Sequence, residues 1–482
     1  MTDPARHHAE ARPAAPALVT PDETWTWADL DARVGTCAAR LAAPPRPADV
    51  WGGAAPLAVR ARTSPALVVL VLAALRAGRT LVPLSTRWPA PAVADTLDRL
   101  GLDALVVDDS DGVPSGLRAT PLADLTRAGG EAPVLDPRGS IPASRPLTVV
   151  HTSGSTGTPK AALHTVGNHV ASARGVIERV RLGAGDSWLL DLPLYHVGGL
   201  GVVVRCALAG AALALPGPGM ATPEAVRTLR PTHASFVATQ LRRLLDGAAE
   251  DAASLRAVLL GGSAVPTALL DEAAARALPV ATSYGLTEMT STVTATAPGA
   301  DRPALGTSGT VLGGRALRIA GGGEIKVGGA ALFAGYLGRG ALTPPGDWFA
   351  TGDLGRLDDA GRLVVTGRRG LMFVSGGENV QPEAVEAALL ALDGVAEAVV
   401  VPVPDAEFGH RPAAFVRTTG AAPPDADALR AALRRTLPGF MVPTAVYPWG
   451  GAGGMKPDRP ALARRAEGGA AGSDDGGGAG GS

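Results

Sequence analysis

Short apolar segments alternate along the chain with longer segments whose apolar residues recur at helical spacing. Residues 67–77 are almost wholly apolar and end at Gly78, a pattern that predicts a buried helix and its C-cap. Short, mostly apolar runs typical of buried strands occur at 81–84, 104–107, 189–192, 211–215, 234–237 and 257–260. Because strands that alternate with helices stack in layers, we predict an α/β fold with a mostly parallel sheet.

The pattern changes from about Ala304 to short strands separated by turns, and a compact unit of helices and strands begins at Pro382. We therefore predict a large N-terminal domain of layered α/β subdomains over residues 1–367. A small, mobile α+β domain is predicted over 368–467. Residues 468–482 are almost all Gly, Ala, Ser and Asp, a composition typical of a disordered tail.

The composition narrows the function classes. The chain has 482 residues, of which 46% are hydrophobic and 18% charged, as in globular proteins of two or three domains. The net charge of −1 gives no field that attracts nucleic acid or an anionic membrane. Cys37 and Cys206 are the only cysteines, which argues against a disulfide framework or a cysteine metal site. The N-terminus lacks an apolar signal core and the apolar run 197–215 carries Arg205, so we expect a cytoplasmic protein without membrane insertion.

The most informative segment is the loop 152–160, Thr-Ser-Gly-Ser-Thr-Gly-Thr-Pro-Lys. A predicted strand at 147–151 precedes it, and we expect the Ala-rich stretch from Ala161 to continue as a helix. Glycines allow close backbone approach, N–H groups can point inward and Lys160 adds a positive charge, so the loop suits a polyphosphate. The spacing fits neither a Walker A loop nor a Gly-x-Ser-x-Gly elbow. The alternative is a flexible surface linker.

A second segment, 282–288, reads Thr-Ser-Tyr-Gly-Leu-Thr-Glu. Its tyrosine offers a flat face for adenine, its threonine hydroxyl can reach a phosphate, and its glutamate can hold Mg²⁺. The alternative is a plain helix start with the threonine as N-cap. Upstream, the strand at 257–260 ends in the glycine turn Leu-Gly-Gly-Ser of residues 260–263, which a simple strand–turn–helix joint also explains.

In this order, the motifs resemble the signatures of the acyl-adenylate-forming superfamily, which includes acyl-CoA ligases, adenylation domains and luciferases. The resemblance covers about residues 18–465. It implies a large N-terminal and a small mobile C-terminal domain. It also implies ATP binding by Thr152, Ser153, Gly154, Ser155, Thr156, Gly157, Lys160, Gly262, Ser263, Tyr284, Gly285, Thr287, Asp353 and Arg368.

The resemblance also implies individual chemical roles. Thr287 would take part in catalysis, Glu288 would hold Mg²⁺, and Asp353, in Thr-Gly-Asp, would accept hydrogen bonds from both ribose hydroxyls. In Gly-Arg, Arg368 would reach the ribose or phosphate side, and Lys456 would serve adenylation.

The C-terminal motifs extend this assignment and also depart from the family pattern. Gly376 and Gly377 would lie at the mouth of the pantetheine tunnel and contact CoA. Gly370 stands where the family hinge usually has Asp or Lys, and Met455 and Pro457 alter the surroundings of the catalytic lysine. These departures change the predicted hinge between the domains and the loop that carries Lys456.

The substrate is indicated by residues 192–200 and by Arg205. His196 matches a family histidine beside the acyl pocket and is a candidate catalytic residue. Arg205 stands in an apolar run, where a buried cation needs a partner. That partner is a substrate carboxylate, a protein acid, or solvent at an exposed helix face. The segments 375–383 and 405–412 resemble those of o-succinylbenzoate–CoA ligases.

The implied enzyme is an AMP-forming acid–thiol ligase that converts o-succinylbenzoate, ATP and CoA to o-succinylbenzoyl-CoA, AMP and pyrophosphate through acyl-AMP, in menaquinone synthesis. Its partners would be these small molecules, with Mg²⁺ as cofactor, and a homo-oligomer is left open. Alternatives are an acyl- or aryl-CoA ligase for another acid and a stand-alone adenylation enzyme that loads a carrier protein. A non-enzymatic nucleotide sensor is disfavoured by the presence of Lys160, Glu288 and Lys456 together.

Overall fold

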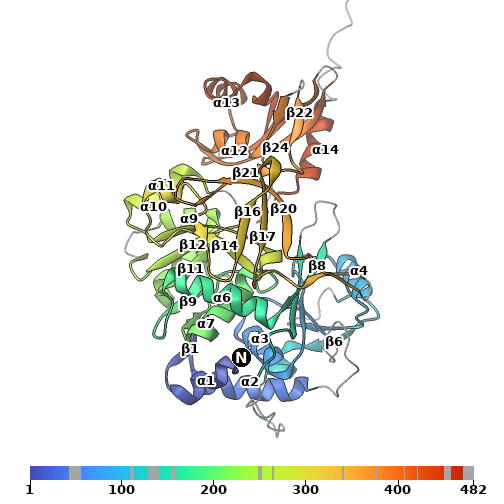
Figure 1. Ribbon diagram of the computed structural model, residues 1–482, viewed down its shortest axis with the longest axis vertical. Helices are drawn as coiled ribbons and strands as arrows, with labels where there is room; N and C mark the ends of the chain where they lie inside the picture. Colours follow the sequence, from blue (N-terminus) through green and yellow to red (C-terminus); the bar gives the residue numbers. More distant parts are fainter. Residues whose placement is uncertain are drawn as a thin grey trace, which may run out of the picture.

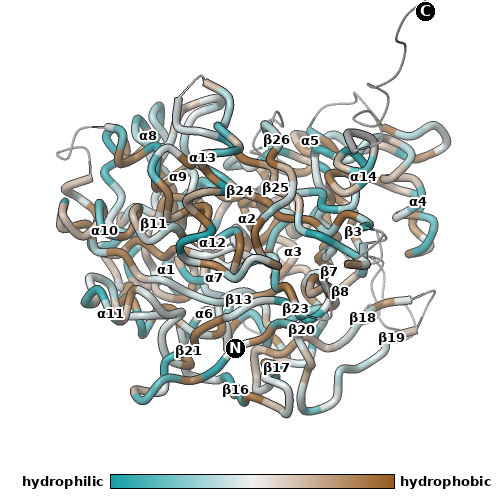
Figure 2. Tube along the Cα trace, turned by 90° about the horizontal axis from the view of Figure 1, so that it is seen from above, coloured by the Kyte–Doolittle hydropathy of each residue, from teal (hydrophilic) through white to brown (hydrophobic). Residues whose placement is uncertain are grey.

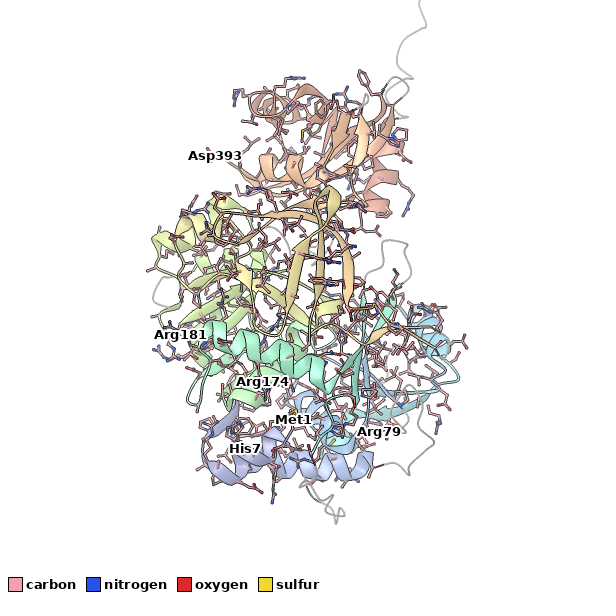
Figure 3. The ribbon with its side chains drawn as sticks, in the orientation of Figure 1. Met1, His7, Arg79, Arg174, Arg181 and Asp393 are labelled. Atoms are coloured by element: carbon pink, nitrogen blue, oxygen red, sulfur yellow. The ribbon has the colours of Figure 1, made fainter. Side chains whose placement is uncertain are left out.

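The computed structural model describes residues 1–42, 56–108, 113–127, 129, 140–152, 159–247, 252–262, 265–338, 341–375, 378–405, 408–420, 422–449 and 457–470. Helices and strands are mixed throughout, which confirms the predicted α/β class. In Figure 1 the N-terminal elements lie at the bottom and the C-terminal elements form a separate layer at the top. In Figure 3 Met1 is labelled among the N-terminal elements and Asp393 beside the C-terminal ones.

A nine-stranded sheet forms much of the N-terminal part. Its central strands pair in parallel, and three of them, β10, β11 and β12, are buried along their whole lengths, as expected of strands covered on both faces. Antiparallel strands close both edges. The order across the sheet is β15 (Thr310–Val311), β14 (Ser291–Ala295), β13 (Val280–Leu286), β12 (Ala257–Leu260), β11 (His233–Phe236), β9 (Ser187–Leu189), β10 (Ala212–Ala214), β1 (Pro16–Val19) and β2 (Thr24–Thr26).

An eight-stranded sheet lies beside it. One half is parallel and the other antiparallel, with the change of direction between β7 and β8. The order is β19 (Leu342–Thr343), β18 (Gly335–Leu337), β8 (Lys160–Thr165), β7 (Pro146–Thr152), β4 (Leu81–Pro83), β3 (Leu57–Arg60), β5 (Ala104–Val107) and β6 (Arg118–Pro121).

Strand β8 corrects the expectation that the stretch from Ala161 continues as a helix. It pairs antiparallel with β7, with Lys160 opposite Thr152, and buries Ala161 to His164. The helix α6 (Val166–Val180) begins only after Thr165, whose hydroxyl and Asn168 form a capping box. Tertiary pairing therefore overrides the local helix propensity of alanine here.

Helices cover both sheets. The most apolar, α3 (Pro65–Ala77), is buried from Leu67 to Leu75 and ends at Gly78 with φ of 72°, as the sequence predicts. The other helices of the N-terminal part are α1 (Pro4–Ala11), α2 (Trp27–Leu41), α4 (Ala90–Leu100), α5 (Leu122–Thr126), α7 (Val197–Ala209), α8 (Thr222–Leu229), α9 (Ala238–Leu245), α10 (Thr267–Ala275) and α11 (Arg302–Leu305).

A third, antiparallel sheet stands between the N-terminal layers and the C-terminal elements (Figure 1). Its strands, in order across the sheet, are β16 (Ala316–Ile319), β17 (Glu324–Gly328), β20 (Trp348–Leu357) and β21 (Leu363–Arg368). After β21 the chain enters β22 (Phe373–Ser375), β23 (Glu378–Val380), α12 (Pro382–Leu390), β24 (Val395–Asp405), β25 (Gly409–Thr418), α13 (Ala426–Leu433), β26 (Ala445–Pro448) and α14 (Arg459–Ala470).

The C-terminal elements bury apolar residues of their own, including Val385, Leu389 and Leu433. A separate core of this kind supports the predicted division near residue 367, which remains a prediction. Helix α14 includes residues 468–470, and the rest of the predicted tail lies outside the described residues.

Figure 2 shows apolar segments running through the interior and hydrophilic ones along outer helices such as α4 and α8. Among the helices that the structure describes, none combines the length and apolarity needed to cross a membrane.

Candidate active site

Some of the predicted nucleotide-binding residues meet where the N-terminal sheets come together. Tyr284 on β13 donates a hydrogen bond from its hydroxyl to Oδ2 of Asp353 on β20, over 2.7 Å. Arg368, at the end of β21, donates from Nη1 to Oδ1 of the same carboxylate, over 3.0 Å. These contacts bring together three residues that the sequence predicts to bind ATP.

The backbone at this junction is tightly packed. A Cβ at Gly285 would lie 2.3 Å from the carbonyl oxygen of Ser291, so glycine is required where β13 passes β14. Gly262 has φ of 89°, a left-handed conformation that favours glycine. The predicted glycine turn therefore follows β12 as expected, whereas Tyr284 and Gly285 continue a strand and do not begin a helix.

Glu288 follows β13 in a short 3-10 turn, Thr287–Met289, in place of the alternative α-helix start. Tyr336 on β18 donates a hydrogen bond from its hydroxyl to Glu288 Oε1. No hydrogen bond to Oε2 is present among the described residues, and a carboxylate oxygen is the hard ligand that Mg²⁺ prefers. The geometry therefore fits the predicted magnesium role of Glu288. Lys160, the first residue of β8, places Nζ 5.2 Å from the centroid of the Tyr336 ring.

A buried histidine, His164, supports the Thr287–Glu288 turn, and a second one, His169, packs against it. His164 Nε2 donates to the carbonyl oxygen of Thr287 over 2.7 Å, and Thr148 Oγ1 lies 2.8 Å from Nε2 of His169. Burial lowers the pKa of His164 to about 4 and that of His169 to about 3, so both rings are neutral near pH 7.

Arg205 on α7 is one of the most deeply buried side chains, with a relative exposure of 1%. Its Nη2 donates to Ser291 Oγ over 3.2 Å, and its guanidinium carbon lies 5.2 Å from the centroid of the Trp188 ring. Its Nε has no hydrogen-bond partner, and its two partners among the described residues, Ser291 and Trp188, carry no negative charge. Burial lowers the pKa of Arg205 to about 10, so it remains a cation at neutral pH.

His196 caps the N-terminus of α7 and is open to solvent on one side. Its ring contacts Tyr195 at a centroid distance of 4.7 Å. Surrounding protein lowers its pKa, and the positive charge of Arg87 lowers it further. These features place a neutral imidazole at the end of the helix that carries Arg205.

Several predicted site residues lie outside the described part of the chain. They are Ser153, Gly154, Ser155, Thr156, Gly157, Ser263, Gly376, Gly377 and Lys456. Conversely, the sequence analysis missed Tyr336, His164, Ser291 and Trp188. Tyr336 is separated by many positions from Lys160 and Glu288, so only the pairing of β18 with β8 reveals the contact.

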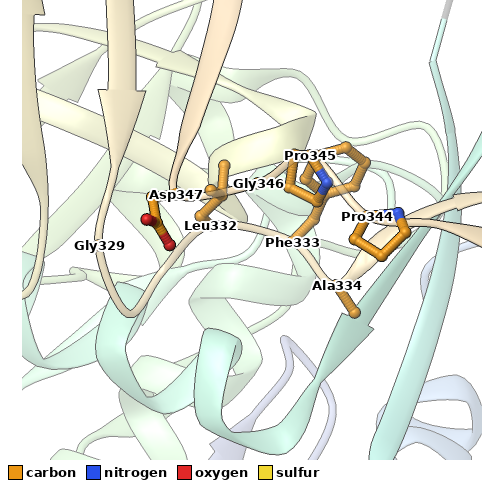
Figure 4. Close-up of a pocket in the computed structure, with 8 residues that line it drawn as sticks. All are labelled: Gly329, Leu332, Phe333, Ala334, Pro344, Pro345, Gly346 and Asp347. Atoms are coloured by element: carbon orange, nitrogen blue, oxygen red, sulfur yellow. The ribbon is translucent and has the colours of Figure 1, made fainter.

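An open hollow of about 540 Å³ lies nearby, between the turn at 329–334 and the segment 344–347 (Figure 4). Its lining is mostly backbone, proline and apolar side chains, with Asp347 as the charged member. It contains none of the predicted nucleotide-binding residues. Phe333 connects it to the site, because its backbone N–H donates to the carbonyl oxygen of Glu288 over 2.8 Å.

Two family models match the chain. One, described as AMP-binding enzyme, matches residues 5–337, and a second, described as AMP-binding enzyme C-terminal domain, matches residues 384–450. The first match spans more than half of the chain, so the chain belongs to the AMP-binding enzyme family.

Within this family, the chain is similar to individual ligases of known name and structure. The 2-succinylbenzoate–CoA ligase of Salmonella typhimurium is 38% identical over 417 residues, which cover 86% of each chain. The o-succinylbenzoate CoA synthetase of Bacillus subtilis in complex with the acyl-adenylate intermediate superposes with a TM-score of 0.84 at 27% identity, over 96% of this chain and 98% of that chain. The same enzyme in complex with ATP and magnesium ion gives 0.82 at 27% identity, over 93% and 96%.

The buried histidines predict a specific pH dependence of stability. The folded pKa of His164, about 4, lies below its ordinary value of 6.5, so the unfolded chain binds more protons between these values. The contribution of the neutral His164 ring to the free energy of unfolding is complete above pH 6.5 and is lost as the pH falls towards 4.

His164→Gln keeps an N–H that can reach the Thr287 carbonyl but cannot titrate. Its melting temperature should therefore fall less steeply than that of the wild type between pH 6.5 and 4. His7→Gln, at an exposed position, is the control and should keep the wild-type slope. Thermal melts across this range decide the matter, and identical slopes for His164→Gln and wild type would contradict it.

Proposed function

We propose that this chain is a 2-succinylbenzoate–CoA ligase. It joins 2-succinylbenzoate to CoA and converts ATP to AMP and pyrophosphate, through an acyl-adenylate, in menaquinone synthesis. Membership of the AMP-binding family and the similarity to ligases of this name support the reaction. The observation in the structure that carries the choice of substrate is Arg205, a buried cation for which the described residues provide no carboxylate. A dicarboxylate acid supplies the missing partner.

The nucleotide half of the site has defined parts. Asp353, held by Tyr284 and Arg368, would accept hydrogen bonds from the ribose hydroxyls. Lys160, whose Nζ lies over the Tyr336 ring, would bring a positive charge to the phosphates. Glu288 would hold Mg²⁺, which when bound neutralises phosphate charge. Thr287 precedes Glu288 in the same turn, where its hydroxyl can contact a phosphate.

The chemistry proceeds in two steps. A carboxylate oxygen of the acid attacks the α-phosphorus of ATP, the bond to the bridging oxygen breaks, and pyrophosphate leaves. The sulfur of CoA then attacks the acyl carbonyl carbon, and AMP leaves with the electron pair of the broken C–O bond. The protein supplies alignment and cations for the charge that develops on the phosphates, so no covalent enzyme intermediate is needed.

The remaining residues of the proposal follow from the family pattern. Lys456 would assist the first step, and Gly376 and Gly377 would admit the pantetheine arm of CoA for the second. His196 would line the acyl pocket at the start of α7. A movement of the C-terminal domain between the steps fits a division near residue 367. We further propose that the enzyme works in the cytoplasm, as a monomer or as a homo-oligomer.

The reaction is tested by substrate competition. With ATP and Mg²⁺, 2-succinylbenzoate should release pyrophosphate faster than benzoate or a fatty acid, and addition of CoA should give its thioester. Pyrophosphate release and thioester mass are the measurements. Faster turnover of benzoate or a fatty acid, with 2-succinylbenzoate inert, would contradict the assignment and favour another acyl- or aryl-CoA ligase.

Arg205→Ala should raise the apparent KM for 2-succinylbenzoate by about tenfold or more, since a desolvated charge pair is lost. ATP affinity should hardly change, because the nucleotide residues lie on other elements. A monocarboxylate analogue without the second acid group should be affected little. Arg174→Ala, at an exposed position of α6, is the matched control. An equal loss for both acids would mean that Arg205 supports the fold and does not select the substrate.

A further inference from the structure

Tyr336 lies between the two charged groups predicted to meet the phosphates of ATP and their metal ion. Its hydroxyl donates to Oε1 of Glu288, and Lys160 Nζ lies over its ring at 5.2 Å from the centroid. The three residues come from different places: Lys160 from β8, Tyr336 from β18 and Glu288 from the turn after β13. One phenol thus contacts both the cation and the carboxylate.

The hydroxyl can act only as a donor to this carboxylate. A carboxylate oxygen can only accept, so the Tyr336 hydroxyl is the donor in this hydrogen bond. A hydrogen bond to a charged acceptor is short and directional, and it limits rotation of the carboxylate. Since Oε1 already accepts the Tyr336 hydroxyl, Oε2 is the oxygen whose lone pairs are both open to a metal ion among the described contacts.

The aromatic ring is itself held on two sides. Phe333 packs edge-on against Tyr336 at a centroid distance of 4.8 Å, and Phe349 lies at 6.3 Å. The backbone N–H of Phe333 also donates to the carbonyl oxygen of Glu288 over 2.8 Å. The segment 333–336 therefore fixes both the backbone and the side chain of Glu288.

We propose that Tyr336 is a positioning residue for magnesium-bound ATP: its hydroxyl orients Glu288 towards the metal ion and its ring guides Lys160 towards the phosphates. This inference rests on the proposed function of the site in binding ATP. It does not depend on which acid is the substrate. Second-layer partners of this kind commonly tune the affinity of a metal ligand.

Tyr336→Phe isolates the role of the hydroxyl, because phenylalanine keeps the ring beneath Lys160. Isothermal titration of the full chain with ATP, without any acid, is carried out with excess Mg²⁺ and again with EDTA. ATP binding with Mg²⁺ should weaken by about tenfold, as expected for loss of one hydrogen bond to a charged group. Binding of metal-free ATP should stay within about twofold of wild type, since no metal ion then needs Glu288.

The other tyrosines provide matched controls. Tyr284→Phe removes the donor to Asp353 and should weaken ATP binding equally with and without Mg²⁺. Tyr447→Phe, in the C-terminal part, should change neither. A double variant provides a second test. Adding Tyr336→Phe to Glu288→Gln should cause no further loss of ATP affinity in the presence of Mg²⁺, because the two residues act through one contact.

Three outcomes would overturn the inference. Tyr336→Phe could weaken ATP binding equally with and without Mg²⁺, or leave ATP binding with Mg²⁺ unchanged. Its effect on ATP affinity could also add to that of Glu288→Gln. Each of these leaves the proposed ligase reaction intact, provided that the wild type binds ATP more tightly with Mg²⁺. A wild type that binds no ATP under either condition would overturn the proposed function as well.

Discussion

Two half-buried tyrosines, each donating a hydrogen bond from its hydroxyl to a carboxylate on another element, hold the site together. Tyr284 joins the nine-stranded sheet to Asp353 of the four-stranded sheet, and Tyr336 of the eight-stranded sheet reaches Glu288. Burial and the adjacent carboxylates raise the pKa of both phenols, so both remain donors. Hydrogen bonds to charged groups contribute about 1.5–3 kcal/mol each, enough to hold carboxylates in place where sheets meet. The position of the nucleotide-binding groups follows from these cross-sheet contacts.

The second constraint is the burial of Arg205 without an acidic partner among the described residues. A lone buried guanidinium is costly, and Ser291 and the Trp188 ring compensate it only in part. The cost is tolerable where a bound anion restores the pairing, and we propose that a second substrate carboxylate is this anion. Membership of the AMP-binding enzyme family indicates adenylation chemistry, and the buried cation Arg205 favours an acid with a second carboxylate.

Much of the fold could be predicted from the sequence, because buried strands and helix ends leave local signals. The helix ending at Gly78 and the strands 104–107 and 257–260 lie where apolar runs predict them. The prediction of a helix after Lys160 was wrong. Alanine favours helices locally, whereas pairing with β7 makes this stretch a strand.

The candidate site residues also fall into two groups, those that a local motif indicates and those that no local motif indicates. Tyr284, Glu288 and Asp353 were found because each stands in a short motif with its own chemistry. Tyr336 and His164 were missed because they act through partners far away along the chain, His164 on the Thr287 carbonyl and Tyr336 on Glu288. No local pattern marks such residues, and only the pairing of sheets brings them to the site.

Hydrogen-exchange mass spectrometry of the full chain with ATP and Mg²⁺ tests most directly whether one site forms where three sheets meet. We predict slower amide exchange at the same ATP concentration in three separate segments: 160–165 on β8, 284–290 at the end of β13 and in the turn that follows, and 349–354 on β20. Protection confined to a single sheet, or absent from all three segments while ATP is bound, would contradict it.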